Sequence, residues 1–232
     1  MAVEVNKNNK VYINGEIVSD PKISHELYGE KFYKFFVEIK RLSGTFDVIP
    51  VTLSERLIDV NTLKKGNVIC GLGQLRTHNK IENGKSKLFL TVFLREIFEE
   101  SNGKNPNNIC ILGTICKEPI YRETPLAREI TDLLVAVNRP YGKSDYIPCI
   151  AWGRNARFSK DFQVGDKISL VGRIQSREYQ KTFGTEIKKL QAYEVSITRL
   201  AKVEEGQEYD IDSDFELYSI PRQTRTEKVN DL

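Results

Sequence analysis

The sequence predicts an all-β protein with two similar domains in tandem, and two observations support this. The first is an internal repeat at a spacing of 98 residues, which runs without a gap for about forty positions. A repeat of this length is a duplicated domain rather than a solenoid unit, because solenoid units recur every 20–50 residues or so. The second is the pattern of short apolar segments rich in Val, Ile, Tyr and Phe, which are bounded by Gly, Asn, Asp or Lys as strands are.

The repeat and the segments together predict the same elements in each copy. In the first copy, strands are expected at 11–17, 32–39, 46–53, 67–76 and 88–98, with a short helix at 54–63. In the second copy, strands are expected at 109–116, 131–137, 144–151, 167–179 and 186–197, with a helix at 154–162. Five strands with one helix between the third and fourth describe the OB-fold, a partly open Greek-key barrel. The sequence therefore predicts two tandem OB-fold five-stranded Greek-key barrels.

Composition and charge divide the chain into three parts. A polar segment at 99–108 contains Gly and Pro but no large apolar side chain, so we expect the first OB-fold at 1–100 and the second at 101–200. Residues 201–232 form an acidic C-terminal tail, with four Lys or Arg against nine Asp or Glu, and the rest of the chain has a balance of +8. The tail is predicted to be disordered. A basic body followed by an acidic tail indicates a polyanion partner for which the tail competes.

Several classes of function have no support in the sequence. No apolar run approaches the length of a membrane span, and residues 1–10 have no apolar signal region, so we expect a cytoplasmic protein. The four cysteines form no Cys-x-x-Cys pair, and Cys110 and Cys149 lie in apolar runs that predict small buried side chains. The two histidines, His25 and His78, stand near no nucleophile–base pair. We therefore expect neither an enzyme nor a metal or other cofactor.

One sheet face of the second copy carries rings and guanidinium groups. Side chains alternate between faces along a strand, so Tyr146 and Trp152 share a face with positions 148 and 150, while positions 147, 149 and 151 face a core. On the next strand, Arg173, Arg177 and Tyr179 share a face with position 175. Flat aromatic platforms interleaved with arginines suit single-stranded nucleic acid. The alternative is that Trp152 and Tyr179 seal the end of the barrel and the arginines are solvated.

These residues resemble the bacterial single-stranded DNA-binding proteins. The resemblance rests on the segments "DYIPCIAWGRNARF" from Asp145, "VGDKISLVGRIQSREYQ" from Val164 and "NRPYGKSD" from Asn138, and it covers about 107–199. It implies that aromatic platforms stand at Tyr141, Tyr146, Trp152 and Tyr179. With the arginines, the predicted interface comprises Tyr141, Tyr146, Trp152, Arg173, Arg177, Tyr179, Arg139 and Arg154. Secondary contacts are predicted at Lys80, Lys85, Lys87 and Arg76.

The first copy lacks the platforms of the second. In the register of the repeat, which shifts from 98 to 99 after one extra residue, none of the four aromatic positions holds a ring, and the counterparts of Tyr146, Trp152 and Tyr179 are Val48, Ser54 and Lys80. Gln74 and His78 stand where the second copy has arginines. This favours a structural or pairing role for the first OB-fold. The alternative is a differently built face that uses the lysines at positions 64, 65, 80, 85 and 87, which would bind phosphate without sequence preference.

The sequence therefore predicts a non-enzymatic single-stranded DNA-binding protein that acts in replication, recombination or repair. RNA is a second ligand compatible with stacking platforms. The alternative function is an OB-fold accessory or scaffold protein, primosome-type or phage-borne, whose main role is to bridge other proteins. An acidic-aromatic stretch at 208–221 either docks replication or repair proteins or only solvates the tail. We expect the two copies to pair through their first strands within one chain, and two such chains to form a homodimer.

Overall fold

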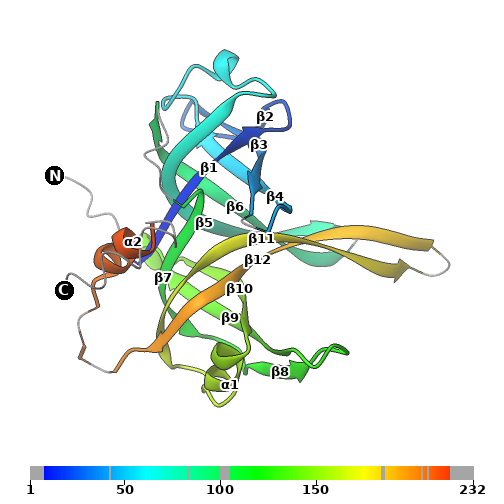
Figure 1. Cartoon of the computed structure of the whole chain (residues 1–232). Helices are drawn as coiled ribbons and strands as arrows, with labels where there is room; N and C mark the ends of the chain where they lie inside the picture. Colours follow the sequence, from blue (N-terminus) through cyan, green and yellow to red (C-terminus); the bar gives the residue numbers. More distant parts are fainter. Residues whose placement is uncertain are drawn as a thin grey trace.

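The computed structural model describes residues 8–41, 43–82, 84–99, 105–183, 186–204, 206–207 and 209–219. The first copy contains β1 (Asn9–Ile17), β2 (Lys22–Leu27), β3 (Glu30–Lys40), β4 (Phe46–Ser54), the 3-10 turn η1 (Val60–Thr62), β5 (Val68–Glu82) and β6 (Lys85–Phe98). The second contains β7 (Asn107–Ile115), β8 (Ile120–Glu123), β9 (Glu129–Asn138), the 3-10 turn η2 (Pro140–Gly142), β10 (Ser144–Trp152), α1 (Arg154–Ser159), β11 (Lys167–Phe183) and β12 (Glu186–Lys202). A last helix, α2 (Ile211–Ser219), follows β12 (Figure 1).

All twelve strands belong to one continuous sheet that curls into a barrel at each end. The strand order is β2-β3-β4-β6-β5-β1-β7-β11-β12-β10-β9-β8, and the additional pairings β3–β1 and β7–β9 bring each half round on itself. The two halves meet where β1 and β7 pair antiparallel, with Val11 opposite Ile109. The predicted pairing of the two first strands within one chain is confirmed by this register. The all-β class is confirmed as well.

Alternation along the central strands separates two apolar regions. Val11 and Ile13 of β1 point into the main core, while Tyr12 between them belongs to a smaller cluster on the opposite face of the sheet. Cys110 on β7 and Val171 on β11 join Tyr12 in that cluster. The sheet is therefore covered on both faces at its centre, by the barrel interiors on one side and by α2 on the other.

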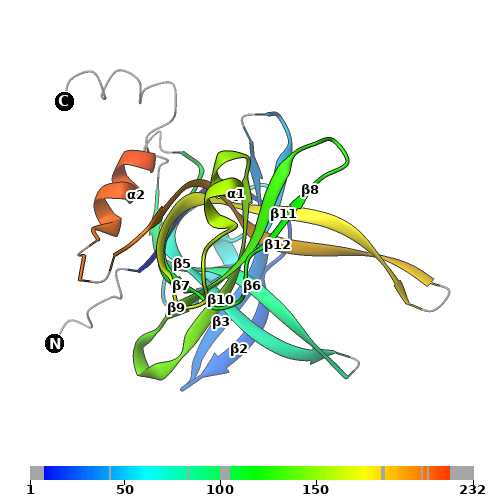
Figure 2. The ribbon, with the colours of Figure 1, turned by 90° about the horizontal axis from the view of Figure 1, so that it is seen from below.

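In both copies one long strand, β5 or β11, bends at a β-bulge that requires glycine. The register shifts between Leu72 and Gly73 on β5, and between Val171 and Gly172 on β11. A Cβ atom at Gly73 would lie 2.1 Å from the carbonyl oxygen of Phe93, and one at Gly172 would lie 2.4 Å from that of Ser196. Such an approach of backbone to backbone excludes any side chain. Beyond the bulges, the β5–β6 and β11–β12 hairpins extend away from α2 on the far side of the molecule (Figure 2).

The structure corrects three expectations. Each copy has a sixth strand, β2 or β8, so the barrels are not limited to five strands; both extra strands are exposed along their whole length and carry no buried alternation. The helix expected at 54–63 is only the 3-10 turn η1, whereas the helix expected at 154–162 is present as the shorter α1. The tail expected to be disordered contributes residues 201 and 202 to β12 and forms α2.

α2 packs on the junction between the two copies. Ile211 and Phe215 are each 2% exposed, and they contact a cluster formed by Tyr12, Cys70, Cys110 and Val171. Two ion pairs fix the helix, one between Lys10 Nζ and Asp212 Oδ1 at 2.9 Å and one between Arg199 and Asp214. The buried positions recur every four residues, which is a helical pattern that acidic composition conceals. The chain beyond position 219, including the final "RTEKVNDL", lies outside the described residues.

Candidate nucleic-acid interface

Two aromatic rings are exposed on β10 of the second copy. Tyr146 near the start of the strand is 45% exposed, and Trp152 at its end is 38% exposed. The alternate positions 147, 149 and 151 are buried, as the sequence predicts. Ile150 is an exception on the aromatic face: it is 4% exposed because it lies between Asp132 of β9 and Ser196 of β12. The strand thus presents two separated rings with a buried apolar floor between them.

Arg177 and Tyr179 lie together on β11, as the alternation predicts. The guanidinium carbon of Arg177 is 5.8 Å from the centre of the Tyr179 ring, and its Nε is 3.6 Å from Glu194 Oε1. Arg177 is exposed and Tyr179 is half-buried. A guanidinium stacked over a ring gives a surface on which a base can stack and beside which a phosphate can be neutralised.

Two further predicted residues lie at the ends of β10. Arg154 is exposed at the first position of α1, directly after Gly153, whose φ of 52° makes the sharp turn out of β10. Arg154 thus follows Trp152 by two positions in the chain, directly after this turn. Tyr141 lies in η2 before β10, and its side chain is outside the part of the chain that the structure describes.

Three of the predicted arginines bind buried aspartates at the junction of the two copies. Asp145 of the second copy is fully buried; Arg139 of its own copy pairs with it, and Arg76 Nη1 of the first copy lies 3.0 Å from its Oδ2. The backbone N–H of Thr77, also in the first copy, donates to the same carboxylate. Asp145 is therefore the point at which the second copy holds the first.

The mirror arrangement exists at Asp47 of the first copy. Arg41 of the same copy donates to this buried carboxylate, and Arg173 Nη1 of the second copy lies 3.2 Å from its Oδ2. The backbone N–H of Ser176 donates to Asp47 Oδ1 at 2.9 Å. Each aspartate thus receives one arginine from its own copy and one from the other. The order of arginine and glutamine along the strand is reversed between the copies. Arg76 follows the Gln74 to which it hydrogen-bonds, whereas Arg173 precedes its partner Gln175.

This geometry changes the assignment of Arg76, Arg139 and Arg173. Sequence alternation places them on the predicted face, but their charge is committed to buried carboxylates rather than offered to a ligand. Burial by itself would raise the pKa of Asp145, yet hydrogen bonds from Arg139 and Thr77 outweigh it and hold that pKa below its ordinary value. We therefore assign these three arginines to the joint between the two copies, which they help to hold together, rather than to ligand binding. Two guanidinium groups around one carboxylate still leave each cluster with a net positive charge.

The lysines predicted as secondary contacts lie on the β5–β6 hairpin. Lys80 and Lys87 are exposed and stand directly opposite each other in the ladder. Lys87 Nζ is 5.1 Å from the centre of the Phe89 ring. Lys85 lies at the start of β6, and its side chain is outside the described residues. The hairpin therefore carries positive charge next to an aromatic ring.

The residues that surround the Phe89 ring were not predicted from the sequence. Lys34 on β3 and His78 on β5 both lie against Phe89, and Phe36 lies beside Lys34. No pattern within β3 or β6 alone would have joined them, because β4 stands between these two strands in the sheet. An alternation of Lys and Phe at positions 34 and 36 was the one available signal.

Other chemistry receives no support from the described part of the chain. Within it, no three His, Cys, Asp or Glu side chains gather as metal ligands, and no helix is long and apolar enough to cross a membrane. Cys110 and Cys149 are buried, as predicted, and burial raises the pKa of the Cys110 thiol to about 12. A thiol with such a pKa is protonated at neutral pH and is a poor nucleophile or metal ligand.

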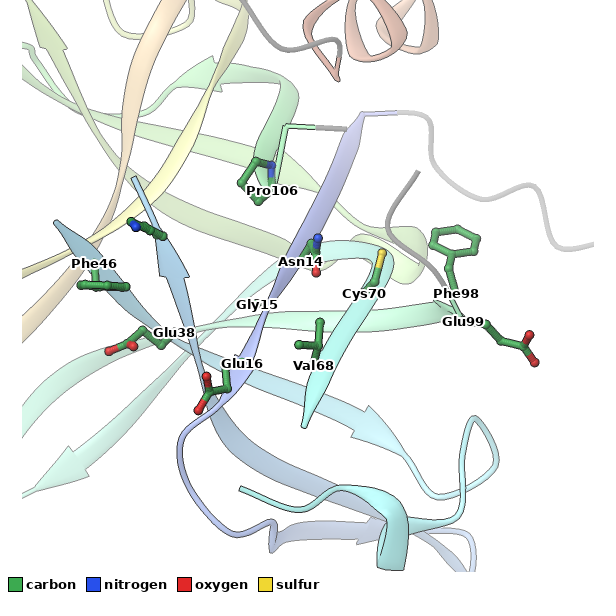
Figure 3. Close-up of a pocket in the computed structure, with 11 residues that line it drawn as sticks. Asn14, Gly15, Glu16, Glu38, Phe46, Val68, Cys70, Phe98, Glu99 and Pro106 are labelled. Atoms are coloured by element: carbon green, nitrogen blue, oxygen red, sulfur yellow. The ribbon is translucent and has the colours of Figure 1, made fainter. Parts of the chain in front are cut away.

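An open pocket of about 500 Å³ lies at one end of β1, but its charge is unsuited to nucleic acid (Figure 3). Glu16 and Glu38 line it from paired positions on β1 and β3, with Glu99 and the exposed ring of Phe46. Lys40 is the one basic residue in the lining. Phosphates would be repelled here, so the pocket is not part of the interface.

Comparisons with known proteins match the part of the chain that carries these rings. The model of a family described as "Single-strand binding protein family" matches residues 106–202. "Single-stranded DNA-binding protein 1" of Lactococcus lactis is 30% identical over 88 residues, which are 35% of this chain and 59% of that protein. The protein of the same name from Streptococcus pyogenes is 30% identical over 88 residues, 68% of its length.

A solved structure extends the similarity to both copies. The wild-type single-stranded DNA binding protein from Thermus aquaticus superposes with a TM-score of 0.68 at 20% identity, and the match covers 87% of this chain and 95% of that one. At this identity the similarity concerns the fold. The chain spans between about half and two thirds of the length of the curated relatives it matches.

Proposed function

Because this chain belongs to the single-strand binding protein family, we propose that it binds single-stranded DNA without catalysing a reaction, in replication, recombination or repair. Bases would stack on Tyr146, Trp152 and Tyr179, while Arg177 and Arg154 neutralise phosphates. The observation that carries the proposal is the pair of exposed rings at Tyr146 and Trp152 on one strand of the matched region. Two exposed rings on one face of one strand give flat surfaces on which unpaired bases can stack.

Trp152 supplies the direct test, because it is the only tryptophan in the chain. Its fluorescence should be quenched when oligo-dT is added, and much less by a duplex of equal length. Oligo-U tests the RNA alternative in the same titration. If the single strand leaves the fluorescence unchanged and does not bind in an anisotropy assay, the proposed function is wrong.

Paired substitutions separate stacking from a structural role of the ring. Trp152→Ala should weaken oligo-dT binding by about 1–3 kcal/mol, which is the value measured for one base–aromatic stack. That corresponds to roughly 5- to 150-fold in affinity. Trp152→Phe retains a ring and should keep most of the affinity. If the folded alanine variant binds as tightly as the phenylalanine variant, Trp152 only seals the barrel.

A second proposal concerns how the two copies pair within one chain and how two chains assemble. We propose that 1–100 and 101–200 act as two OB-fold units joined through β1 and β7, and that two chains form a homodimer. Sedimentation should then report about twice the 26.6 kDa mass of one chain. A monomer at micromolar concentration with full DNA affinity would contradict the dimer.

A further inference from the structure

The first copy carries a cluster of rings and positive charges that differs from the described residues at the same positions of the second copy. We call it the Phe89 cluster; it comprises Lys34, Phe36, His78, Lys80, Lys87 and Phe89. Lys34 Nζ lies 5.8 Å from the centre of the Phe36 ring and 5.7 Å from that of Phe89. His78 stacks on Phe89 with centroids 5.4 Å apart and planes inclined by 14°. Both phenylalanines are half-buried, so one edge or face of each remains open.

The charges in this cluster are crowded. Burial lowers the pKa of Lys34, and the nearby Lys80 and Lys87 lower it further. Burial also lowers the pKa of His78, with Lys34, His25, Arg139 and Lys80 acting in the same direction. Like charges held together cost free energy in the absence of a ligand. Such crowding is characteristic of a site that receives an anion.

Comparison at equal register shows that the cluster does not follow from the fold. Lys34 lies opposite Thr52 on β4, and the same position in the second copy is Asp132, opposite Ile150 on β10. Phe89 lies opposite His78, and its counterpart opposite Arg177 is Ala192. Asp132 instead forms an exposed ion pair with Arg122 at 2.9 Å. The first copy has a lysine and a ring where the second has an acid and a methyl group.

The cluster lies next to the exposed rings of the second copy. Thr77, which precedes His78, accepts a hydrogen bond at Oγ1 from the backbone N–H of Tyr146 at 2.9 Å. The charge of Arg139, beside Asp145, reaches His78. His78 therefore lies one residue along β5 from a contact with the start of β10. A single strand that spans both copies can reach the Phe89 cluster and Tyr146 together.

We propose that the Phe89 cluster is a second single-strand site, in which bases stack on Phe89 and Phe36 while Lys34, Lys80 and Lys87 neutralise the phosphates. The inference rests on the proposed function, because it extends the same strand from the second copy to the first. It replaces the structural role that the sequence favours for the first copy. Lysines act as mobile point charges, so this site contributes affinity without base preference.

Strand length separates the two sites experimentally. One OB-fold covers about 4–16 nucleotides, so an oligo-dT of about 8 nucleotides can occupy the second copy alone and one of about 35 can occupy both. In a first variant, Lys34→Gln and Lys87→Gln are combined; in a second, Phe89→Leu removes the ring but keeps an apolar side chain. Binding is followed by anisotropy of labelled DNA and by quenching of Trp152.

The variants should lose affinity for the long strand by about tenfold or more and keep their affinity for the short one. The slope of log affinity against log salt for the long strand should become shallower by about 0.7 for each lysine removed. Lys117→Gln with Lys167→Gln is the matched control, since both lysines are exposed, lie outside the predicted interface and are not among the charges that reach Lys34. This control should bind both strands as the parent does.

Three results would overturn the proposal. Unchanged long-strand affinity in the double lysine variant would show that the cluster does not bind DNA. An equal loss on both strands would show that it acts through the second copy. A loss of the same size in the Lys117 and Lys167 control would show that only net charge matters. Failure of the proposed function is distinct, because then neither strand would quench Trp152 in the parent protein.

Discussion

At the start of β10 the second copy has the exposed Tyr146, whereas the first copy has Val48 at the same position of β4. At the end of these strands the pair is the exposed Trp152 and the buried Ser54. In the first copy the rings lie on the neighbouring strands instead, at Phe36 of β3 and Phe89 of β6. The same barrel thus presents two differently built surfaces. The comparison shows that the position of rings on an OB-fold can shift while the strand framework stays in place.

The two strands that pair at the joint between the copies, β1 and β7, differ far less than the surfaces, since each is hydrogen-bonded to its own copy in the same way. Asn9 of the first copy exchanges two hydrogen bonds with the backbone of Leu75, at 2.8 and 2.9 Å. Asn107 does the same with Ile174, at 2.7 and 2.9 Å. The buried aspartates and their paired arginines are matched in the same way. Contacts that both copies need simultaneously leave little freedom to change one alone.

The strongest test of this joint is the removal of either buried carboxylate. Asp145→Ala leaves two partly buried guanidiniums, those of Arg76 and Arg139, without their partner. Breaking a buried pair from one side costs about 3–5 kcal/mol, and we expect a loss of this size in the free energy of unfolding in urea. Asp47→Ala should cause a similar loss because its environment is the mirror image.

The matched control for both variants is Asp132→Ala. Asp132 pairs with Arg122 on the exposed surface, and exposed pairs contribute at most about 1 kcal/mol. If Asp145→Ala and Asp47→Ala cost no more than this control, the carboxylates do not hold the copies together. If one of the two substitutions lowers the free energy of unfolding much more than the other, the two aspartates contribute unequally to stability despite their symmetric geometry.

The next largest effect concerns α2, which covers the joint from outside and has contacts in both copies. Phe215→Ala should lower the free energy of unfolding by up to about 3 kcal/mol, because the ring is 2% exposed but the helix can undock instead of leaving a cavity. Leu217→Ala on the same helix is the control, since Leu217 is 39% exposed. Equal melting temperatures for the two variants would show that α2 does not stabilise the body.

The structure also changes what truncation of the tail should do. The sequence leads us to expect that removal of 201–232 leaves the fold intact and raises affinity at low salt. Because α2 is docked and β12 runs to Lys202, we now expect truncation before Ile211 to lower the melting temperature. The competition of the acidic residues with DNA remains a separate prediction, measured as affinity at low salt in the same variant.

Local sequence patterns were sufficient to predict most strands, but they missed the exposed strand β2 and the helix α2. The alternation of buried positions in β10 could be predicted because every second residue is apolar, and the repeat doubled the evidence. β2 was missed because all six residues from Lys22 to Leu27 are exposed and no alternation marks them. α2 was missed because its two buried apolar positions, Ile211 and Phe215, are outnumbered by acidic neighbours.

The arginines show a second kind of limit. Alternation places Arg173 correctly on a sheet face, but its partner Asp47 is 126 positions away in the sequence. No local pattern identifies such a partner. The repeat offered one signal, since Asp47 aligns with Asp145 and Arg41 with Arg139, and a charged pair retained in both copies indicates a structural use. The exchange of Arg and Gln between positions 74–76 and 173–175 obscured the rest.

A smaller effect, on DNA binding rather than on stability, tests the difference between β10 of the second copy and β4 of the first. Tyr146→Ala should weaken the binding of a short oligo-dT by about 1–3 kcal/mol, since one stacking platform is lost. Val48→Ala, at the equivalent position of the first copy, should leave this affinity within about 0.5 kcal/mol of the parent, as substitutions outside a specific feature do. Equal effects in the anisotropy titration would mean that the two faces do not differ in function.

The smallest expected effect is the response of the joint to acid. The pKa of Asp145 is held below its ordinary value, so its ionised form stabilises the folded state. This contribution is fully present above the unfolded-state pKa of about 3.9, and it is lost as the pH falls through the lower folded-state pKa. Urea midpoints should therefore change little for this reason between pH 7 and pH 5 and fall below pH 4. Asp145→Asn cannot titrate at this position, so the gap in stability between parent and variant should narrow as the pH falls from 5 to 3. A gap of constant size over that range would mean that Asp145 has the same pKa in the folded and unfolded chain, and that its arginines do no more than cancel the effect of burial.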